Sequence, residues 1–197
     1  MEGSIAMLNG KTVAILATDG FEYSELVQPR AALREAGAET RVVSLTGGSI
    51  RGVDGKDWTG EVDVDALIDN VTSETFDALV LPGGVYNPDQ LRQNHRAVAL
   101  VRAMVADKKP VAAICHGPWL LIEADVLRGR AATSYPSLKT DMTNAGADWR
   151  DQPLVVDQGL ITSRHPGDLD AFCAKLVDAI AESRHDTRAE THRAAAG

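Results

Sequence analysis

One cysteine stands where a buried strand is expected to turn directly into a helix. The apolar run at 111–114 ends just before Cys115, and a helical pattern at 119–122 begins after only His116, Gly117 and Pro118. So short a turn lifts its first residue clear of the sheet. The side chain then lies at the carboxyl end of a strand and near the positive start of a helix, which favours a thiolate. The pattern predicts a nucleophilic cysteine; the alternative is a small buried residue that only packs.

Two acidic residues precede or open the first predicted helix, Glu22 and Glu25. We expect Glu22 to complement the dipole of that helix. Glu25 is expected to face the crevice, where a carboxylate and a thiolate at contact distance cannot both stay charged. We therefore expect the pair to share one proton, with Glu25 keeping it and donating a hydrogen bond to the Cys115 thiolate.

Backbone amides and a histidine complete the predicted site. Gly83 and Gly84 follow a buried strand at 78–81 and have no side chains to cover their N–H groups. With the amide of His116 they form a candidate oxyanion hole; the alternative is that they only make a tight exit from the strand. His116 can curl back to transfer protons if a carboxylate orients it. The histidines expected at surface or capping positions are His95, His165, His185 and His192.

The elements that must position these groups alternate along the chain. Buried strands are predicted at 11–18, 39–45, 78–81 and 111–114, and helices at 23–36, 94–107, 136–145 and 168–183. A small hairpin is predicted within 46–60, a helical turn at 64–69, a loop at 82–90, and a second hairpin at 154–162. The alternation predicts an α/β fold with a doubly wound, mostly parallel sheet and helices on both faces. The carboxyl ends of the first, third and fourth strands then meet in one crevice.

Length and composition are those of one ordinary domain. The chain has 197 residues, of which 44% are hydrophobic and 24% charged. We expect a single domain over 1–183 and a polar, loose tail over 184–197. No apolar run approaches the length of a membrane span, and the first residues lack the pattern of a secretion signal. We therefore expect no membrane partner and a cytoplasmic location.

Charge and cysteine usage argue against other classes of protein. The net charge is −8 and the basic residues form no stripe, so we expect no nucleic-acid partner. Cys115 and Cys173 have neither metal-ligand spacing nor a disulfide framework, and we expect no metal and no cofactor. Cys173 is expected to pack on the last helix, and Trp119 to belong to the core or to an interface rather than to contact a ligand.

Four segments are distinctive: AICHGPWLLIEADVLRGR, LVLPGG, TSYPSLKTDMTNAGADW and LITSRHPGDLDAFC. Together they resemble the PfpI family of intracellular cysteine peptidases and stress proteins, within the class I glutamine amidotransferase-like superfamily. The similarity runs from about Lys11 to Ile180. The resemblance implies a flavodoxin-like fold and a homo-oligomer, at least a dimer.

The resemblance also implies roles for individual residues. Cys115 matches the family nucleophile, His116 its histidine, and Glu25 the acid that hydrogen-bonds the cysteine. Asp89 matches a carboxylate, usually Glu, that completes the triad from a neighbouring subunit, although the preceding loop differs in length here. Tyr135 matches a tyrosine that lines the pocket.

The implied function is a cysteine-dependent hydrolase, linked to the stress response, that acts on small peptides or on glyoxal and methylglyoxal adducts. In the mechanism common to these activities the thiolate attacks a carbonyl or hemithioacetal carbon, amides hold the oxyanion, and His116 moves the proton. The alternative is a redox-sensing or chaperone-like stress protein whose low-pKa cysteine is oxidised without turnover. A glutaminase domain fits less well, because its late His-x-Glu motif is absent: His165 is followed by Pro166 and Gly167.

Overall fold

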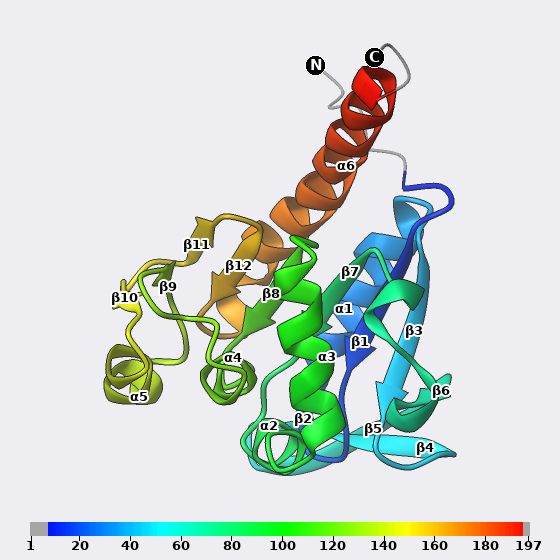
Figure 1. The fold of residues 1–197 in the computed structure, drawn as a ribbon. Coiled ribbons are helices and arrows are strands. Elements are labelled where there is room, and N and C mark those ends of the chain that lie inside the picture. Colours follow the sequence, from blue (N-terminus) through cyan, green and yellow to red (C-terminus); the bar gives the residue numbers. More distant parts are fainter. Residues whose placement is uncertain (1–7, 195–197) are drawn as a thin grey trace.

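The computed structural model describes residues 8–194, with side chains over 8–183. Its centre is a seven-stranded sheet (Figure 1). In sheet order the strands are β11 (Leu154–Asp157), β12 (Leu160–Ser163), β8 (Val111–Ile114), β7 (Ala78–Leu81), β1 (Thr12–Leu16), β3 (Glu39–Ser44) and β6 (Ala66–Leu67). All neighbouring pairs are parallel except the β11–β12 hairpin. The predicted mostly parallel sheet is confirmed.

The chain winds outward from the centre of this sheet twice. It passes from β1 to β3 and β6, then returns to β7 and continues to β8 and β12. The order therefore reverses between β1 and β7, which are hydrogen-bonded neighbours. In open α/β sheets such a reversal leaves a crevice at the carboxyl ends of the strands.

Helices cover both faces of the sheet (Figure 1). They are α1 (Tyr23–Glu35), α2 (Tyr86–Leu91), α3 (His95–Ala106), α4 (Trp119–Glu123), α5 (Lys139–Asn144) and α6 (Leu169–Ala194). Short 3-10 turns are η1 (Ile68–Asn70), η2 (Ser73–Thr75), η3 (Pro136–Leu138) and η4 (Pro166–Asp168). Successive residues of β1 face opposite cores, as a strand requires. Ala14 and Leu16 pack with α3 and α4, whereas Val13 and Ile15 pack with α1 and α6.

Two small sheets flank the main one. A three-stranded sheet is formed by β2 (Phe21–Glu22), β4 (Ser49–Asp54) and β5 (Asp57–Asp63), and a two-stranded sheet by β9 (Ala131–Ala132) and β10 (Asp148–Trp149). The β4–β5 pair confirms the hairpin predicted within 46–60, and it extends to Asp63. The helical turn predicted at 64–69 is shorter and later in the structure: strand β6 occupies Ala66–Leu67, and the 3-10 turn η1 follows at Ile68–Asn70.

Two elements differ from the predictions. The loop predicted at 82–90 contains α2, which has 6 residues, too few to show an apolar period. The last helix continues past Ser183 to Ala194, through most of the predicted loose tail. Six of the 11 residues at 184–194 are Arg, Ala or Glu, which are strong helix formers. Residues 195–197 of that tail lie outside the described residues.

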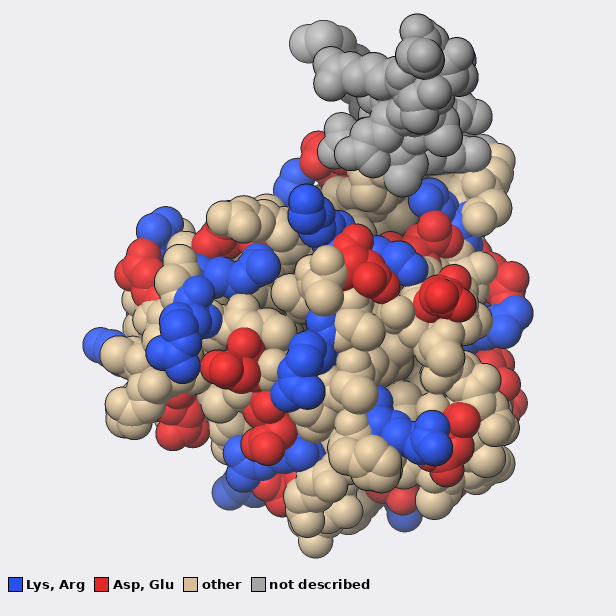
Figure 2. Space-filling view, in the orientation of Figure 1, with Lys and Arg blue, Asp and Glu red and all other residues tan. Residues whose placement is uncertain are grey.

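Acidic and basic side chains alternate over the face drawn in Figure 2, without a continuous stripe of one charge. In the part of the chain that the structure describes, no helix combines the length and the apolar content that crossing a membrane requires.

Candidate active site

The predicted crevice brings together the loops that follow three neighbouring strands. Glu25 comes from α1 after β1, Gly83 follows β7, and Cys115 follows β8. A Cβ atom at Gly83 would lie 2.5 Å from Glu25 Oε2 and 2.6 Å from Cys115 Cβ. Only glycine leaves room for the acid and the cysteine to meet here. The residue at 83, predicted to supply an amide, must therefore also be glycine for steric reasons.

Cys115 occupies a strained turn that is anchored on both sides. Its φ is 61°, a left-handed conformation that is uncommon outside glycine. Its N–H donates to Ser163 O at 3.1 Å, and its carbonyl accepts from Tyr135 N at 2.8 Å. Helix α4 begins only at Trp119 and has 5 residues, so its dipole contributes little at the sulfur. The amides that act on the sulfur are those of Gly84 and His116.

Glu25 is fully buried and held by one backbone bond. Gly83 N–H donates to Glu25 Oε2 at 2.8 Å, and within the described residues no nitrogen or oxygen is bonded to Oε1. Burial raises the pKa of Glu25 to about 8, although the Gly83 bond opposes the rise. The carboxyl therefore carries a proton at neutral pH, as predicted, and the Cys115 sulfur is its neighbouring side-chain partner.

The charge state of Cys115 differs from the sequence prediction. The side chain is 7% exposed. Burial raises the pKa of the thiol above its ordinary value, and an ionised Glu25 raises it further, whereas the Gly84 and His116 amides lower it. The low thiol pKa predicted from the sequence is wrong, because desolvation outweighs the amides. The predicted sharing of one proton is wrong for the same reason, since burial leaves both Cys115 and Glu25 protonated near neutral pH. A protonated thiol needs a base beside it before it can attack.

His116 lies where such a base is needed. Its Nδ1 is 3.2 Å from Cys115 Sγ, and its Nε2 is 3.4 Å from Ser137 Oγ. The ring stacks on Tyr135 at 4.8 Å between centroids and meets Trp119 edge-on at 5.2 Å. Burial lowers the pKa of His116, so the imidazole is neutral near pH 7 and can accept a proton.

The three amides predicted for an oxyanion hole are not equivalent. The Gly83 amide is engaged by Glu25, whereas those of Gly84 and His116 face the sulfur. Gly84 has φ 79°, and a Cβ there would collide with the backbone of Gly20 and Glu22. Gly83 thus positions the acid, and two amides remain to face a reacting group.

Asp89 and Tyr135 were assigned from the resemblance. Tyr135 stacks on the His116 ring and so lines the site. Asp89 lies on α2, where its 43% exposed side chain pairs with Arg92 at 3.0 Å. Both ring nitrogens of His116 contact other groups within the chain. A role for Asp89 at a neighbouring subunit's histidine stays a prediction.

Two residues of the site were not predicted. Ser137 contacts His116 Nε2 from η3. It lies within the TSYPS segment, but nothing in its residue type or spacing predicted a contact with the histidine. Asn87 is fully buried: its Oδ1 accepts from Thr18 N at 2.8 Å, and its Nδ2 donates to the carbonyls of Pro82 and Gly83 at 3.0 and 3.1 Å. Asn87 thereby ties the loop after β1 to the double-glycine loop.

The remaining candidates have structural roles. Glu22 stands at the N-cap of α1, and its Oε2 accepts from Gly55 N at 3.2 Å rather than capping with its side chain. His165 caps η4 by accepting from Gly167 N, as predicted, whereas His95 is exposed and Asn94 caps α3.

Two further predictions concern packing. Cys173 packs against the core on α6, as predicted. Trp119 packs against the other core and also contacts His116, so it is more than a core residue. The side chains of His185 and His192 lie outside the described residues.

This geometry supports nucleophilic attack with general-base assistance. A buried thiol, a neutral imidazole at hydrogen-bond distance and two amides aimed at the reacting atom are the parts that covalent catalysis by cysteine uses. A protonated carboxyl next to the sulfur can donate a hydrogen bond to the thiolate once it forms.

Comparison with known families and proteins finds clear similarity over most of the chain. The model of the DJ-1/PfpI family matches residues 11–179. General stress protein 18 of Bacillus subtilis (strain 168) is 52% identical over 164 residues, which cover 83% of this chain and 94% of that protein. Protein/nucleic acid deglycase 2 of Escherichia coli (strain K12) is 48% identical over 163 residues, covering 82% and 93%.

A solved structure has the same fold over most of the chain. Drosophila melanogaster DJ-1beta superposes with a TM-score of 0.79 at 30% identity, covering 87% of this chain and 90% of that one. The predicted flavodoxin-like α/β fold and the resemblance to PfpI are both confirmed. The chain belongs to the DJ-1/PfpI family.

Proposed function

We propose that this protein is a cysteine-dependent hydrolase of the deglycase or peptidase type that serves in the stress response. The observation that carries the proposal is the 3.2 Å contact between Cys115 Sγ and His116 Nδ1 inside a buried crevice. Its substrates are glyoxal or methylglyoxal adducts, or small peptides. The relatives named as a deglycase and as a general stress protein support this assignment.

The first chemical step follows from the protonation states. His116 Nδ1 takes the proton of the Cys115 thiol, and the sulfur forms a bond to the carbonyl carbon of the substrate. The carbonyl electron pair moves to the oxygen, which accepts hydrogen bonds from the amides of Gly84 and His116. When the intermediate collapses, His116 gives that proton to the leaving group, and the acyl group stays on the sulfur as a thioester. A water, deprotonated by His116, then attacks the thioester carbon, and the proton returns to the freed Cys115 sulfur.

Glu25 supports this step without being the base. Its raised pKa keeps it protonated near neutral pH, so it adds no negative charge beside the sulfur. As the thiolate forms, the carboxyl donates a hydrogen bond to it. The thiolate is therefore stabilised at the moment of attack rather than before it.

A turnover assay tests the proposal. The substrates are methylglyoxal-modified N-acetylcysteine and short fluorogenic peptides, assayed with the wild type, Cys115→Ser and Cys173→Ser. We expect Cys115→Ser to lower kcat/KM by at least about 10³-fold. Cys173→Ser should stay within about twofold of the wild type, because Cys173 packs on α6, whereas the sulfur beside His116 Nδ1 is that of Cys115.

The same assay separates the redox alternative. Mild peroxide that oxidises Cys115 in a protein without turnover on either substrate class would favour a redox-sensing or chaperone-like role. Turnover that survives Cys115→Ser would exclude the covalent mechanism.

We also propose that the protein is a homo-oligomer that works in the cytoplasm. Val85 and Tyr86 are 57% and 63% exposed, and they form the start of α2, the helix that carries Asp89. Apolar side chains in such a position are typical of a surface that another subunit covers. Both cysteines of the chain are free, which agrees with a reducing compartment.

A further inference from the structure

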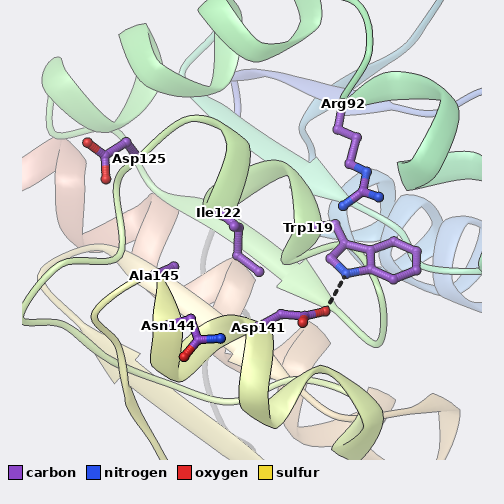
Figure 3. Close-up of a pocket in the computed structure, with 7 residues that line it drawn as sticks. All are labelled: Arg92, Trp119, Ile122, Asp125, Asp141, Asn144 and Ala145. Carbon is purple, nitrogen blue, oxygen red and sulfur yellow. Dashed lines mark hydrogen bonds between the residues drawn. The ribbon is translucent and has the colours of Figure 1, made fainter.

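A groove opens between α4 and α5, beside the active site. Its volume is about 550 Å³, within the range of ligand-binding sites. Figure 3 shows the side chains around it. Those used below are Arg92, Trp119, Ile122, Asp125, Asp141 and Asn144. We call this feature the Trp119 groove.

Trp119 joins the groove to the catalytic pair. Its ring lines the groove and also meets the His116 ring at 5.2 Å. The indole is held in place, because Nε1 donates to Asp141 Oδ2 at 3.2 Å and the Arg92 guanidinium lies over the ring at 4.8 Å (Figure 3). The wall shared with the catalytic histidine is therefore preformed.

The catalytic crevice and the groove differ in the room that they offer. Cys115 is 7% exposed, so only a small reacting group reaches the sulfur. A substrate larger than that group must lie mostly outside the crevice. The groove next to His116 has a volume of about 550 Å³, which offers room for a segment of such a substrate.

The charges around the groove favour a cation. Asp125 and Asp141 both line it, whereas its one cation, Arg92, is already paired with Asp89 at 3.0 Å. Figure 3 shows Arg92 and Asp125 at opposite ends. The partner of Asp125 is Arg128 at 3.5 Å, an exposed pair that contributes little and that a ligand can replace.

The uncharged groups suit a polypeptide. Ile122 offers an apolar surface for an aliphatic stem. The Asn144 side-chain amide can both donate to and accept from a peptide backbone. Asp141 gives one oxygen to Trp119, and no other described side chain bonds its second oxygen.

We propose that the Trp119 groove binds the polypeptide segment next to the attacked carbon and prefers a basic residue there. The proposal rests on the proposed function, since it requires attack by Cys115. It assigns the substrate class: adducts or scissile bonds carried on a basic polypeptide, rather than free small carbonyl compounds.

Matched peptides test the preference. Hexapeptides with a methylglyoxal-modified cysteine carry lysine, norleucine or glutamate on both sides of it. We expect the KM of the lysine peptide to be about three- to fivefold lower than that of the norleucine peptide, with the glutamate peptide highest and kcat nearly equal. Equal KM values for the three peptides would overturn the proposal.

Groove variants then locate the effect. Asp125→Asn and Asp141→Asn remove charge but keep an oxygen that can accept, including the bond from Trp119 Nε1. Each should raise the KM of the lysine peptide toward that of the norleucine peptide, and Asn144→Asp should widen the difference. Asp148→Asn is the control, since Asp148 pairs with Arg150 outside the groove. A lysine preference that persists in the double Asp→Asn variant contradicts the assignment.

Binding separates this proposal from the proposed function. Calorimetry with Cys115→Ser and the unmodified peptides measures the groove without turnover. Tighter binding of the lysine peptide, together with no turnover by the wild type, would show that the groove binds a basic polypeptide, but it would refute the hydrolase and with it the assignment of the bound segment to an attacked carbon. Turnover without any preference in binding or in KM would support the hydrolase and refute the groove.

Discussion

Both cysteines of this chain are shielded from solvent, Cys115 almost fully and Cys173 partly, but their surroundings differ in chemistry. Burial raises the pKa of both thiols, that of Cys173 to about 11, with Asp170 as a second cause. Cys173 lies within α6, whereas Cys115 sits in a left-handed turn beside His116. A perturbed pKa therefore does not distinguish the nucleophile. What distinguishes it is a neutral base at 3.2 Å and two amides facing the sulfur.

The backbone explains why only one region can do this. A residue inside a helix has its N–H and C=O groups committed to the helix ladder. At the turn after β8, by contrast, the amide of His116 is directed at the sulfur, and Gly84 adds a second amide from the neighbouring loop. Reactivity thus depends on irregular backbone held by a regular sheet.

Removing the base should have the largest effect on the difference in reactivity between Cys115 and Cys173. His116→Ala should lower kcat/KM by about 10²–10⁴-fold, because the thiol then loses its proton acceptor. Alkylation kinetics followed by mass spectrometry should show Cys115 becoming as slow as Cys173 near pH 7. His95→Ala is the control, since His95 is exposed at the start of α3. Unchanged turnover in His116→Ala would remove the histidine from the mechanism.

A side chain added at Gly83, between Glu25 and Cys115, should have the next largest effect. Gly83→Ala places a Cβ 2.5 Å from Glu25 Oε2 and 2.6 Å from Cys115 Cβ. We expect a loss of about 1–3 kcal/mol in the free energy of unfolding, as in other overpacked sites. Urea denaturation measures it. At Gly47 an added Cβ finds its nearest atom, Leu67 Cδ2, at 3.8 Å, so Gly47→Ala should be nearly neutral.

Glu25 makes the stability of the Cys115 region depend on pH. Its pKa is raised from 4.5 to about 8, so the folded state holds a proton that the unfolded state releases. The resulting stabilisation is complete below about pH 4.5 and is lost as pH rises toward 8. Glu25→Gln should remove this dependence. The difference in the free energy of unfolding between the variant and the wild type should therefore change by at least about 1 kcal/mol between pH 6 and pH 8.

Two measurements check the prediction for Glu25. Urea denaturation at pH 6, 7 and 8 follows the stability, and the pH profile of Cys115 alkylation follows the loss of the Glu25 proton. Parallel stability curves for the wild type and Glu25→Gln, with identical alkylation profiles, would show that Glu25 does not hold that proton. Cys173 is the internal reference for alkylation in both proteins.

Ser137 should have the smallest effect. Loss of the hydroxyl in Ser137→Ala removes a weak contact of 3.4 Å to His116 Nε2, so we expect about a two- to tenfold drop in kcat/KM. The pH profile should shift, because the hydroxyl stabilises one protonation state of the ring. Ser137→Thr keeps the hydroxyl and should restore most of the activity. A profile identical to that of the wild type would leave Ser137 a purely structural residue.

The regular part of the site was predictable because it depends on local pattern. Apolar runs predicted β1, β7 and β8, and their order placed Glu25, Gly83 and Cys115 at one edge of the sheet. Helix α2 and the contact of Ser137 with His116 were not predictable. The helix is too short for a period, and the contact joins residues 21 positions apart through a 3-10 turn.

The sequence by itself determined the elements and the chemical groups, because hydrophobic period and residue type are properties of short stretches of chain. The tertiary structure alone decided the charge states, since desolvation of Cys115, Glu25 and His116 depends on everything packed around them. It also decided that the Gly83 amide binds the acid and that the Trp119 groove lies beside the catalytic histidine. Distances of this kind arise only when segments far apart in the chain meet.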